Sequence, residues 1–278
     1  MRTITNNAID SCKRYLVEEE KSAATIEKYV HDVSVFAEWL NRTEITKSVV
    51  LDYKHYLMEK YATASVNSIV SSLNSFFDYL GWSDLKVKTI KIQRSVFADK
   101  EKELTRQEYD KLVDVAKGCN YRLFLIMQCI CATGIRVSEL KYITVEALRD
   151  GRAEINNKGK CRVVFLPGKL CKVLKKYAAK QKISSGPVFV SKNGNPLDRS
   201  NIWSSMKKLC KLAGIAASKV FPHNLRHLFA RTYYSIQKDI VRLSDILGHS
   251  NINTTRIYTQ ESGEIHRQQI QKLGLLRC

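Results

Sequence analysis

The first ninety residues place apolar side chains at helical spacing. The clearest case begins at Ser22, a suitable N-cap, and continues to Leu40 with the apolar positions Ile26, Tyr29, Val30, Val33 and Phe36. Similar patterns predict a helix near Ala8–Glu20, one from a cap at Thr46 to about Lys60, and one from a cap at Thr63 to Gly81. Residues 1–90 are therefore predicted to form a four-helix bundle, and no catalytic constellation lies in it.

The pattern changes after residue 90. Residues 91–103 are polar and charged and read as a linker. A capping box, Thr105-Arg106-Gln107-Glu108, then opens a second domain over residues 104–278. Tyr121 to Cys131 is almost wholly apolar but too short for a bilayer, which predicts a buried helix ending at Gly134.

Two short strands are predicted within the second domain. They cover 153–155 and 161–166, separated by a turn at 156–160. Helices are expected at about 168–182, 198–213, 222–236 and 238–247, the second of them capped by Asp198 and ended by Gly214. The predicted fold class is mainly α: a four-helix bundle followed by a mostly helical domain with a small antiparallel β-sheet.

Charge is distributed unevenly over the 278 residues, whose formal net charge is +19. Residues 1–98 hold 13 Lys+Arg and 12 Asp+Glu, a net of +1, whereas residues 99–278 hold 33 and 15, a net of +18. Such an excess attracts a polyanion, and nucleic acid is the usual one. A ribosome-associated protein or a merely soluble basic surface remains an alternative on charge alone.

The sequence also bears on location and metal binding. It starts without the apolar segment of a secretory signal, so we expect a cytoplasmic, nucleoid-associated protein. The eight cysteines form no Cys-x-x-Cys pair and have no His at zinc-like spacing. We therefore expect reduced thiols, no metal and no cofactor.

Three segments carry unusual polar residues at helix ends. In Ala132-Thr133-Gly134-Ile135-Arg136-Val137-Ser138-Glu139-Leu140, an Arg follows a glycine turn and Glu139 shares its helical face. Arg136 could bind a phosphate in bidentate fashion with Glu139 orienting it, and an ordinary salt bridge is the alternative.

The other two segments lie further along the chain. Pro222 suits a first helical turn, so His223 and Arg226 should share a face near the positive end of the helix dipole, where they could hold an anion. The alternative is that both bind core carbonyls, and His227 is expected to be structural. The third segment, Leu247-Gly248-His249-Ser250, is followed by Tyr258, which nothing local marks as a nucleophile.

Taken together, these segments resemble the tyrosine recombinase (phage integrase) family. The matching residues, over about 103–260, are Arg136, Lys158, His223-x-x-Arg226, His249 and Tyr258, in that order. The first bundle is similar to that family's SAM-like core-binding domain, notably at Ser22-Ala23-Ala24-Thr25. Without a separate arm-type domain before the bundle, the chain resembles the compact, Xer-like members.

The resemblance implies phosphoryl transfer on duplex DNA without metal or ATP. Tyr258 would attack the scissile phosphate, giving a 3′-phosphotyrosine and a free 5′-hydroxyl. Arg136 and Arg226 would hold the non-bridging oxygens, His249 would donate a hydrogen bond, and His223 would act as general base or acid. Glu139 matches the family's acidic position.

The resemblance also implies that a lysine on the β-turn protonates the leaving 5′-oxygen. The family's turn often reads Gly-Lys-Gly-x-Lys-x-Arg, and here it is one residue shorter, Asn157-Lys158-Gly159-Lys160-Cys161-Arg162. Lys158 aligns with the usual position and Lys160 is the alternative. Lys160, Arg162 and Arg256 are expected to contact DNA. Arg231 replaces the more usual Thr and bears on packing or DNA contact.

The implied function is site-specific recombination by a tetramer on DNA with inverted-repeat sites. The amphipathic tail over 261–278 would be exchanged between subunits, and a related recombinase or an accessory DNA-bending protein could be a further partner. A type IB topoisomerase and a non-catalytic DNA-binding relative are the alternatives; plasmid relaxation without strand exchange would favour the first. Chromosome dimer resolution, phage integration and mobile-element insertion all remain open.

The small net charge of the first domain poses a question, because a DNA clamp should be basic on both parts. We therefore expect its basic residues near the linker, namely Lys86, Lys88, Lys91 and Arg94, to gather on one DNA-facing side with the acidic residues elsewhere.

Overall fold

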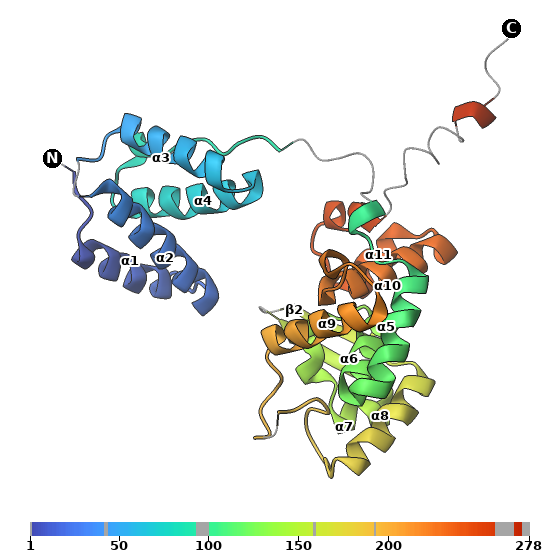
Figure 1. Ribbon diagram of the computed structural model, residues 1–278. Coiled ribbons are helices and arrows are strands. Elements are labelled where there is room, and N and C mark those ends of the chain that lie inside the picture. Colours follow the sequence, from blue (N-terminus) through green and yellow to red (C-terminus); the bar gives the residue numbers. More distant parts are fainter. Residues whose placement is uncertain are drawn as a thin grey trace, which may run out of the picture. The chain divides into compact units, whose positions relative to one another are not determined.

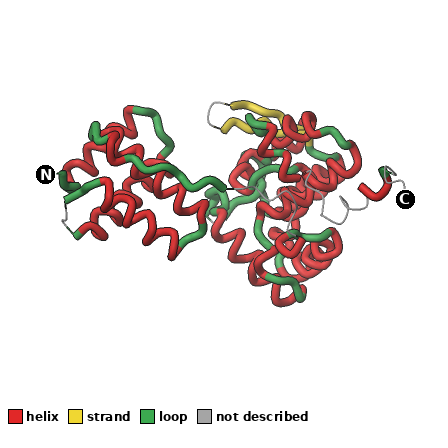
Figure 2. Tube along the Cα trace, turned by 90° about the horizontal axis from the view of Figure 1, so that it is seen from above, coloured by secondary structure: helices red, strands yellow, loops and turns green. Residues whose placement is uncertain are grey.

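The computed structural model describes residues 2–41, 44–92, 100–157, 160–191, 193–258 and 270–273, with the side chains of residues 100, 157 and 160 left out. The chain divides into two compact units, Met1–Arg94 and Ser95–Cys278. The first is helical, and the second is helical with one two-stranded antiparallel sheet (Figures 1 and 2). The predicted fold class is thus confirmed. Within the described residues no helix is long and apolar enough to cross a membrane.

Four helices build the first unit: α1 (Asn6–Glu18), α2 (Ala23–Leu40), α3 (Lys47–Lys60) and α4 (Thr63–Tyr79). The hydroxyls of Ser22 and Thr46 cap α2 and α3 as predicted. The cap expected at Thr63 is wrong by one position, because the N-cap is Ala62 and makes no side-chain hydrogen bond. The apolar face of each helix meets in one core centred on Phe36 and Phe77, both fully buried.

Two asparagines of α4 hold the chain that leaves the bundle. Asn74 accepts from the Val87 N–H at 3.0 Å and donates to the Val87 carbonyl at 2.8 Å. Two turns earlier on the helix, Asn67 makes the same two bonds with Ile90. It accepts from the Ile90 N–H at 2.7 Å and donates to the Ile90 carbonyl at 2.8 Å. Both the N–H and the carbonyl of Val87 and of Ile90 are bonded, as in pairing with a β-strand, so the segment before residue 91 is bound to the first unit.

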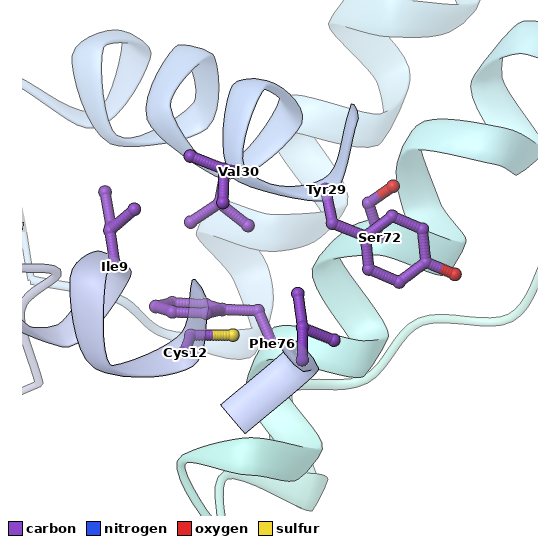
Figure 3. A pocket seen from close by; sticks show the side chains of 8 residues that line it. Ile9, Cys12, Tyr29, Val30, Ser72 and Phe76 are labelled. Carbon is purple, nitrogen blue, oxygen red and sulfur yellow. The ribbon is translucent and has the colours of Figure 1, made fainter. Parts of the chain in front are cut away.

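A cavity of about 10 Å³ lies inside the first unit, between α1, α2 and α4 (Figure 3). Its walls include Ile9, Cys12, Val30 and Phe76, with Ser72 and Tyr29 at the side. A space of this size holds about one water molecule. It is a packing gap, and no ligand site follows from it.

The second unit is built around one buried helix, α6 (Tyr121–Thr133). It contacts α5 (Arg106–Cys119), α8 (Gly168–Lys180), α9 (Arg199–Ala213) and α10 (Pro222–Gln237). The short helices α7 (Val145–Asp150) and α11 (Ile240–Leu247) lie at opposite ends of the unit (Figure 1). The predicted capping box at Thr105 is present, and Gly134 ends α6 in the left-handed conformation, as expected.

The sheet is a hairpin of β1 (Arg152–Asn157) and β2 (Lys160–Phe165), at one edge of the second unit in Figure 2. Ala153, Ile155 and Val164 alternate inward and are buried, while Phe165 is exposed. This alternation places Arg162, opposite Ile155 in the register, beside the helical core.

Contacts also fix the chain that enters the second unit. Lys100–Lys102 forms a short 3₁₀ helix within the stretch predicted to be linker, and residues 93–99 lie outside the described part. Arg231 of α10 forms an ion pair with Glu103 and donates to the Leu104 carbonyl at 2.8 Å. Arg231 thus anchors the start of this unit, a packing role.

Candidate active site

The end of α6 positions the first candidate arginine. Gly134, at φ 68°, turns the chain, and Arg136 follows as the N-cap of a 3₁₀ helix, Val137–Tyr142. Glu139 accepts from the Arg136 backbone N–H at 2.8 Å and from its Nη1 at 3.0 Å. The predicted pairing of Glu139 with Arg136 is present, and about a third of the Arg136 side chain remains exposed.

Glu139 has a second partner that the local sequence does not show. Arg162 of β2 donates from both terminal nitrogens to the Glu139 carboxylate, at 3.0 and 2.8 Å. Burial alone would raise the pKa of Glu139, but the bonds from Arg162 and the Arg136 backbone outweigh it, so its pKa lies below the ordinary value. The Arg162 side chain is 15% exposed, both of its terminal nitrogens are bound to Glu139, and its buried Nε has no hydrogen-bond partner in the described structure, so little of it is available for the DNA contact expected of it.

Arg226 of α10 lies inside the unit, with 1% of its surface exposed. It donates to the carbonyls of Gly134 at 2.6 Å and Leu247 at 2.7 Å, and its Nη2 lies 3.1 Å from Nε2 of His249. The alternative considered for this segment, an arginine bound to core carbonyls, therefore describes Arg226 here. These bonds join the ends of α6, α10 and α11 at one point.

His249 follows α11 and leads to Tyr258. Its Nδ1 lies 2.9 Å from the hydroxyl of Thr255, which is fully buried. The His249 and Tyr258 rings stack at 20°, with their centroids 6.1 Å apart. Tyr258 itself ends the 3₁₀ turn Arg256–Tyr258 and is 4% exposed.

The two histidines of α10, His223 and His227, also lie near Tyr258. The His227 ring meets the Tyr258 ring edge-on, with centroids 4.8 Å apart, and His223 contacts His227 at 4.4 Å. The buried Nε2 of His227 has no hydrogen-bond partner in the described structure. Tyr258 is therefore enclosed by His227 and His249, and His223 stands one ring further out.

Electrostatics keep these histidines neutral near pH 7. Burial, then the charges of Arg226 and Arg136, lowers the pKa of His249 to about 4. Loss of solvent around the ring, then the same two arginines, also lowers the pKa of His223. A neutral imidazole can accept or donate one proton, which general acid–base chemistry requires.

The pKa of Arg226 is lowered as well. Burial, then repulsion from Arg136, lowers its pKa to about 10. It is still charged at neutral pH, so Arg136 and Arg226 provide two neighbouring cations, and Arg226 also interacts with Tyr258. Such a group can hold the oxygens of one phosphate.

The arrangement is a closed one. Arg226 and Tyr258 are both almost fully buried, at 1% and 4% exposed. Lys158 lies outside the described residues, as does the side chain of Lys160. Arg256, the third expected DNA contact, is exposed on the turn before Tyr258.

Two contributors to the site were not singled out from the sequence. Thr255 holds His249, and Gly248 allows the Arg162 side chain to lie against the backbone before His249. Thr255 is visible in the sequence Thr254-Thr255-Arg256, but a hydroxyl in a turn gives no indication of its hydrogen-bond partner. Among the described residues, no cluster of His, Cys, Asp and Glu could hold a metal ion.

Comparisons with known proteins point to the same chemistry. The profile of the phage integrase family matches residues 102–264, and that of the phage integrase N-terminal SAM-like domain matches residues 9–84. Tyrosine recombinase XerA of Pyrococcus furiosus is 29% identical over 99% of this chain and 96% of its own length. Tyrosine recombinase XerA of Thermococcus kodakarensis is 30% identical over 98% and 96%.

Solved structures are similar over almost the whole chain. A crystal structure of XerA recombinase aligns with a TM-score of 0.54 at 27% identity, covering 99% of this chain and 100% of that one. A lambda integrase dimer bound to a COC′ core site aligns with a TM-score of 0.74 at 18% identity, covering 93% and 96%, which shows a shared fold.

Proposed function

The chain belongs to the phage integrase family of tyrosine recombinases, and on that premise we propose that it cleaves and rejoins duplex DNA at specific sites through a 3′-phosphotyrosine intermediate. The observation that carries the proposal is the convergence of Arg136, Arg226, His249 and Tyr258 from separate parts of the chain. A decayed, purely DNA-binding relative would have no reason to keep these groups together.

In the proposed reaction, the Tyr258 oxygen attacks the phosphorus of the scissile phosphodiester. A bond forms between that oxygen and phosphorus, the bond from phosphorus to the 5′-oxygen breaks, and the 5′-strand leaves as a hydroxyl. Arg136 and Arg226 hold the non-bridging oxygens and stabilise the charge of the pentacovalent transition state. Attack by the 5′-hydroxyl of a second strand reverses these steps and releases Tyr258.

Protons are assigned to two groups. His223, with its lowered pKa, accepts the tyrosine proton, and a lysine of the hairpin turn gives a proton to the leaving 5′-oxygen. We assign that lysine to Lys158, with Lys160 as the alternative. At present Nε2 of His249 accepts from Arg226; with the ring proton on Nε2, His249 donates a hydrogen bond to the phosphate in place of this contact.

For the domains, we propose that residues 1–90 form the core-binding domain and residues 104–278 the catalytic domain with its tail, joined by residues 91–103. For the assembly, we propose a tetramer on two duplexes. Lambda integrase, a structural neighbour, is known as a tetramer bound to a Holliday junction. The tail is the segment we expect subunits to exchange, and its described part exposes Ile270 and Leu273. The remaining DNA contacts are assigned to Lys160 and Arg256.

The first experiment uses a nicked suicide duplex that carries the recombination site. Wild-type protein should form a covalent adduct that survives denaturing electrophoresis, and Tyr258→Phe, which removes only the nucleophilic oxygen, should form none. Equal DNA affinity of the two proteins in a gel-shift assay is the control. An adduct that persists in Tyr258→Phe would overturn the assignment.

A further inference from the structure

Arg162 stands out because the mechanism above does not use it, although it is bound tightly to the site. Its two terminal nitrogens donate to the two carboxylate oxygens of Glu139, at 3.0 and 2.8 Å. Glu139 is 1% exposed and the Arg162 side chain 15%. A fork-to-fork pair of this kind is the strongest and most directional ion pair that proteins form.

The charges of this group do not cancel. Glu139 also binds Arg136, so one carboxylate serves two guanidiniums, and the three side chains together carry one net positive charge. Without Arg162, the buried carboxylate would have Arg136 as its only ionic partner. The carboxylate of Glu139 would then neutralise the charge of Arg136, and Arg136 would attract a phosphate less strongly.

A second contact fixes Arg162 in place. Gly248, at φ 66°, directly precedes His249, and a Cβ added there would lie 2.6 Å from Cδ of Arg162. The side chain therefore lies against the backbone of this turn, where only glycine leaves room. Through Glu139 and Gly248, one residue of β2 touches both the Arg136 turn and the start of the His249 segment.

From this geometry we infer that Arg162 is a positioning residue of the cleavage reaction: it neutralises Glu139 so that Arg136 keeps its positive charge and its orientation for the scissile phosphate. The inference rests on the proposed function, since it assigns Arg162 a role in the same site. It replaces the expectation that Arg162 contacts DNA.

The test compares single-turnover cleavage of the suicide duplex at saturating protein. Arg162→Gln should cleave roughly 30-fold more slowly, less than the loss from removing a transition-state donor outright. Its DNA affinity and the salt dependence of that affinity should equal those of wild type, because a lost phosphate contact would lower the salt slope by about one. Arg162→Lys, which keeps the charge, should recover part of the rate.

Two further variants separate charge from structure. Arg162→Gln combined with Glu139→Gln removes both members of the pair and returns the single positive charge to Arg136, so it should cleave faster than Arg162→Gln alone. Arg152→Gln, an exposed arginine on the partner strand, should match wild type. Urea unfolding of each variant tests that it is folded.

The outcomes are distinct. If wild type forms no adduct, the proposed function is wrong. If wild type and Arg152→Gln cleave but Arg162→Gln cleaves equally fast, or loses DNA affinity with an unchanged rate at saturation, the positioning role is wrong. A double variant no faster than Arg162→Gln would also overturn the charge argument.

Discussion

At the scale of single residues, Gly134 shows how closely the backbone approaches the site. It ends α6 in the left-handed conformation, and its carbonyl accepts a hydrogen bond from Arg226. A Cβ at this position would lie 2.4 Å from the ring of Phe229 and 3.2 Å from Leu247. Glycine is thus required here for two reasons: the backbone has a positive φ, and Phe229 and Leu247 leave no room for a Cβ.

Gly134→Ala should therefore lower the free energy of unfolding by more than Gly214→Ala. Both residues are left-handed helix ends, and each substitution costs about 1–2 kcal/mol of backbone strain. Around Gly214 a Cβ would meet nothing within 4 Å, so only Gly134→Ala adds overpacking, about 1–3 kcal/mol more. Urea unfolding measures the difference, and equal losses would contradict the packing argument.

The half-buried histidines His227 and His249 predict how stability responds to acid. Burial and neighbouring charges lower the pKa of His227 to about 3 and of His249 to about 4. The unfolded chain, with histidine pKa values near 6.5, binds these protons first, so the free energy of unfolding is unaffected above about pH 6.5 and falls as pH drops toward 4. The expected loss from pH 7 to pH 5 is about 2 kcal/mol per histidine.

His227→Phe isolates one of these contributions. The variant should lose about 2 kcal/mol less than wild type between pH 7 and pH 5, as measured by urea unfolding at both values. Carboxylates contribute equally to both proteins and cancel in the difference. An identical loss in the two proteins would show that His227 titrates normally in the folded state.

The residues of the site could be predicted from the sequence only in part. The pair of Arg136 and Glu139 is local, three positions apart, and its geometry followed from helical spacing. The carbonyl partners of Arg226 are distant in the chain, and so is the bond from Arg162 to Glu139, 23 positions away. Local periodicity contains no information on such contacts, so the bond from Arg162 to Glu139 could not be predicted from the sequence.

At the scale of elements, caps and glycine stops were predicted well because they are local. Asp198 and Gly214 bound α9, and the capping box at Thr105 opens α5, as the sequence indicated. The segment after α4 was harder to predict. No helix or strand was predicted between Gly81 and residue 90, and the pattern gave no sign that side chains of α4 hold this extended chain.

Asn74→Ala should release this segment without unfolding the bundle. The variant leaves the N–H and carbonyl of Val87 without their partners, at a cost of about 1–3 kcal/mol. Amide hydrogen exchange at Val87 should therefore become at least 5-fold faster, whereas exchange in the buried part of α2 stays as in wild type. Unchanged exchange at Val87 would show that the asparagine does not hold the segment.

At the scale of the whole molecule, the charge is carried by the second unit, as its chemistry on DNA requires. The expected segregation in the first unit is only partly supported. Lys88 and Lys91 are exposed, but Lys86 forms an ion pair with Asp78 at 2.7 Å, and Arg94 lies outside the described residues. Among the described residues, Lys86 thus pairs with an acidic residue instead of lying apart from the acids as expected.

The central claim is that Tyr258 becomes linked to the 3′-phosphate of the cleaved strand. Digestion of the trapped adduct with protease and nuclease, followed by mass spectrometry, locates the modified residue and the linkage. The expected product is a peptide whose Tyr258 carries a nucleotide through its 3′-phosphate, together with a DNA strand ending in a 5′-hydroxyl. A nucleotide on another residue, or a linkage through a 5′-phosphate, would contradict the claim.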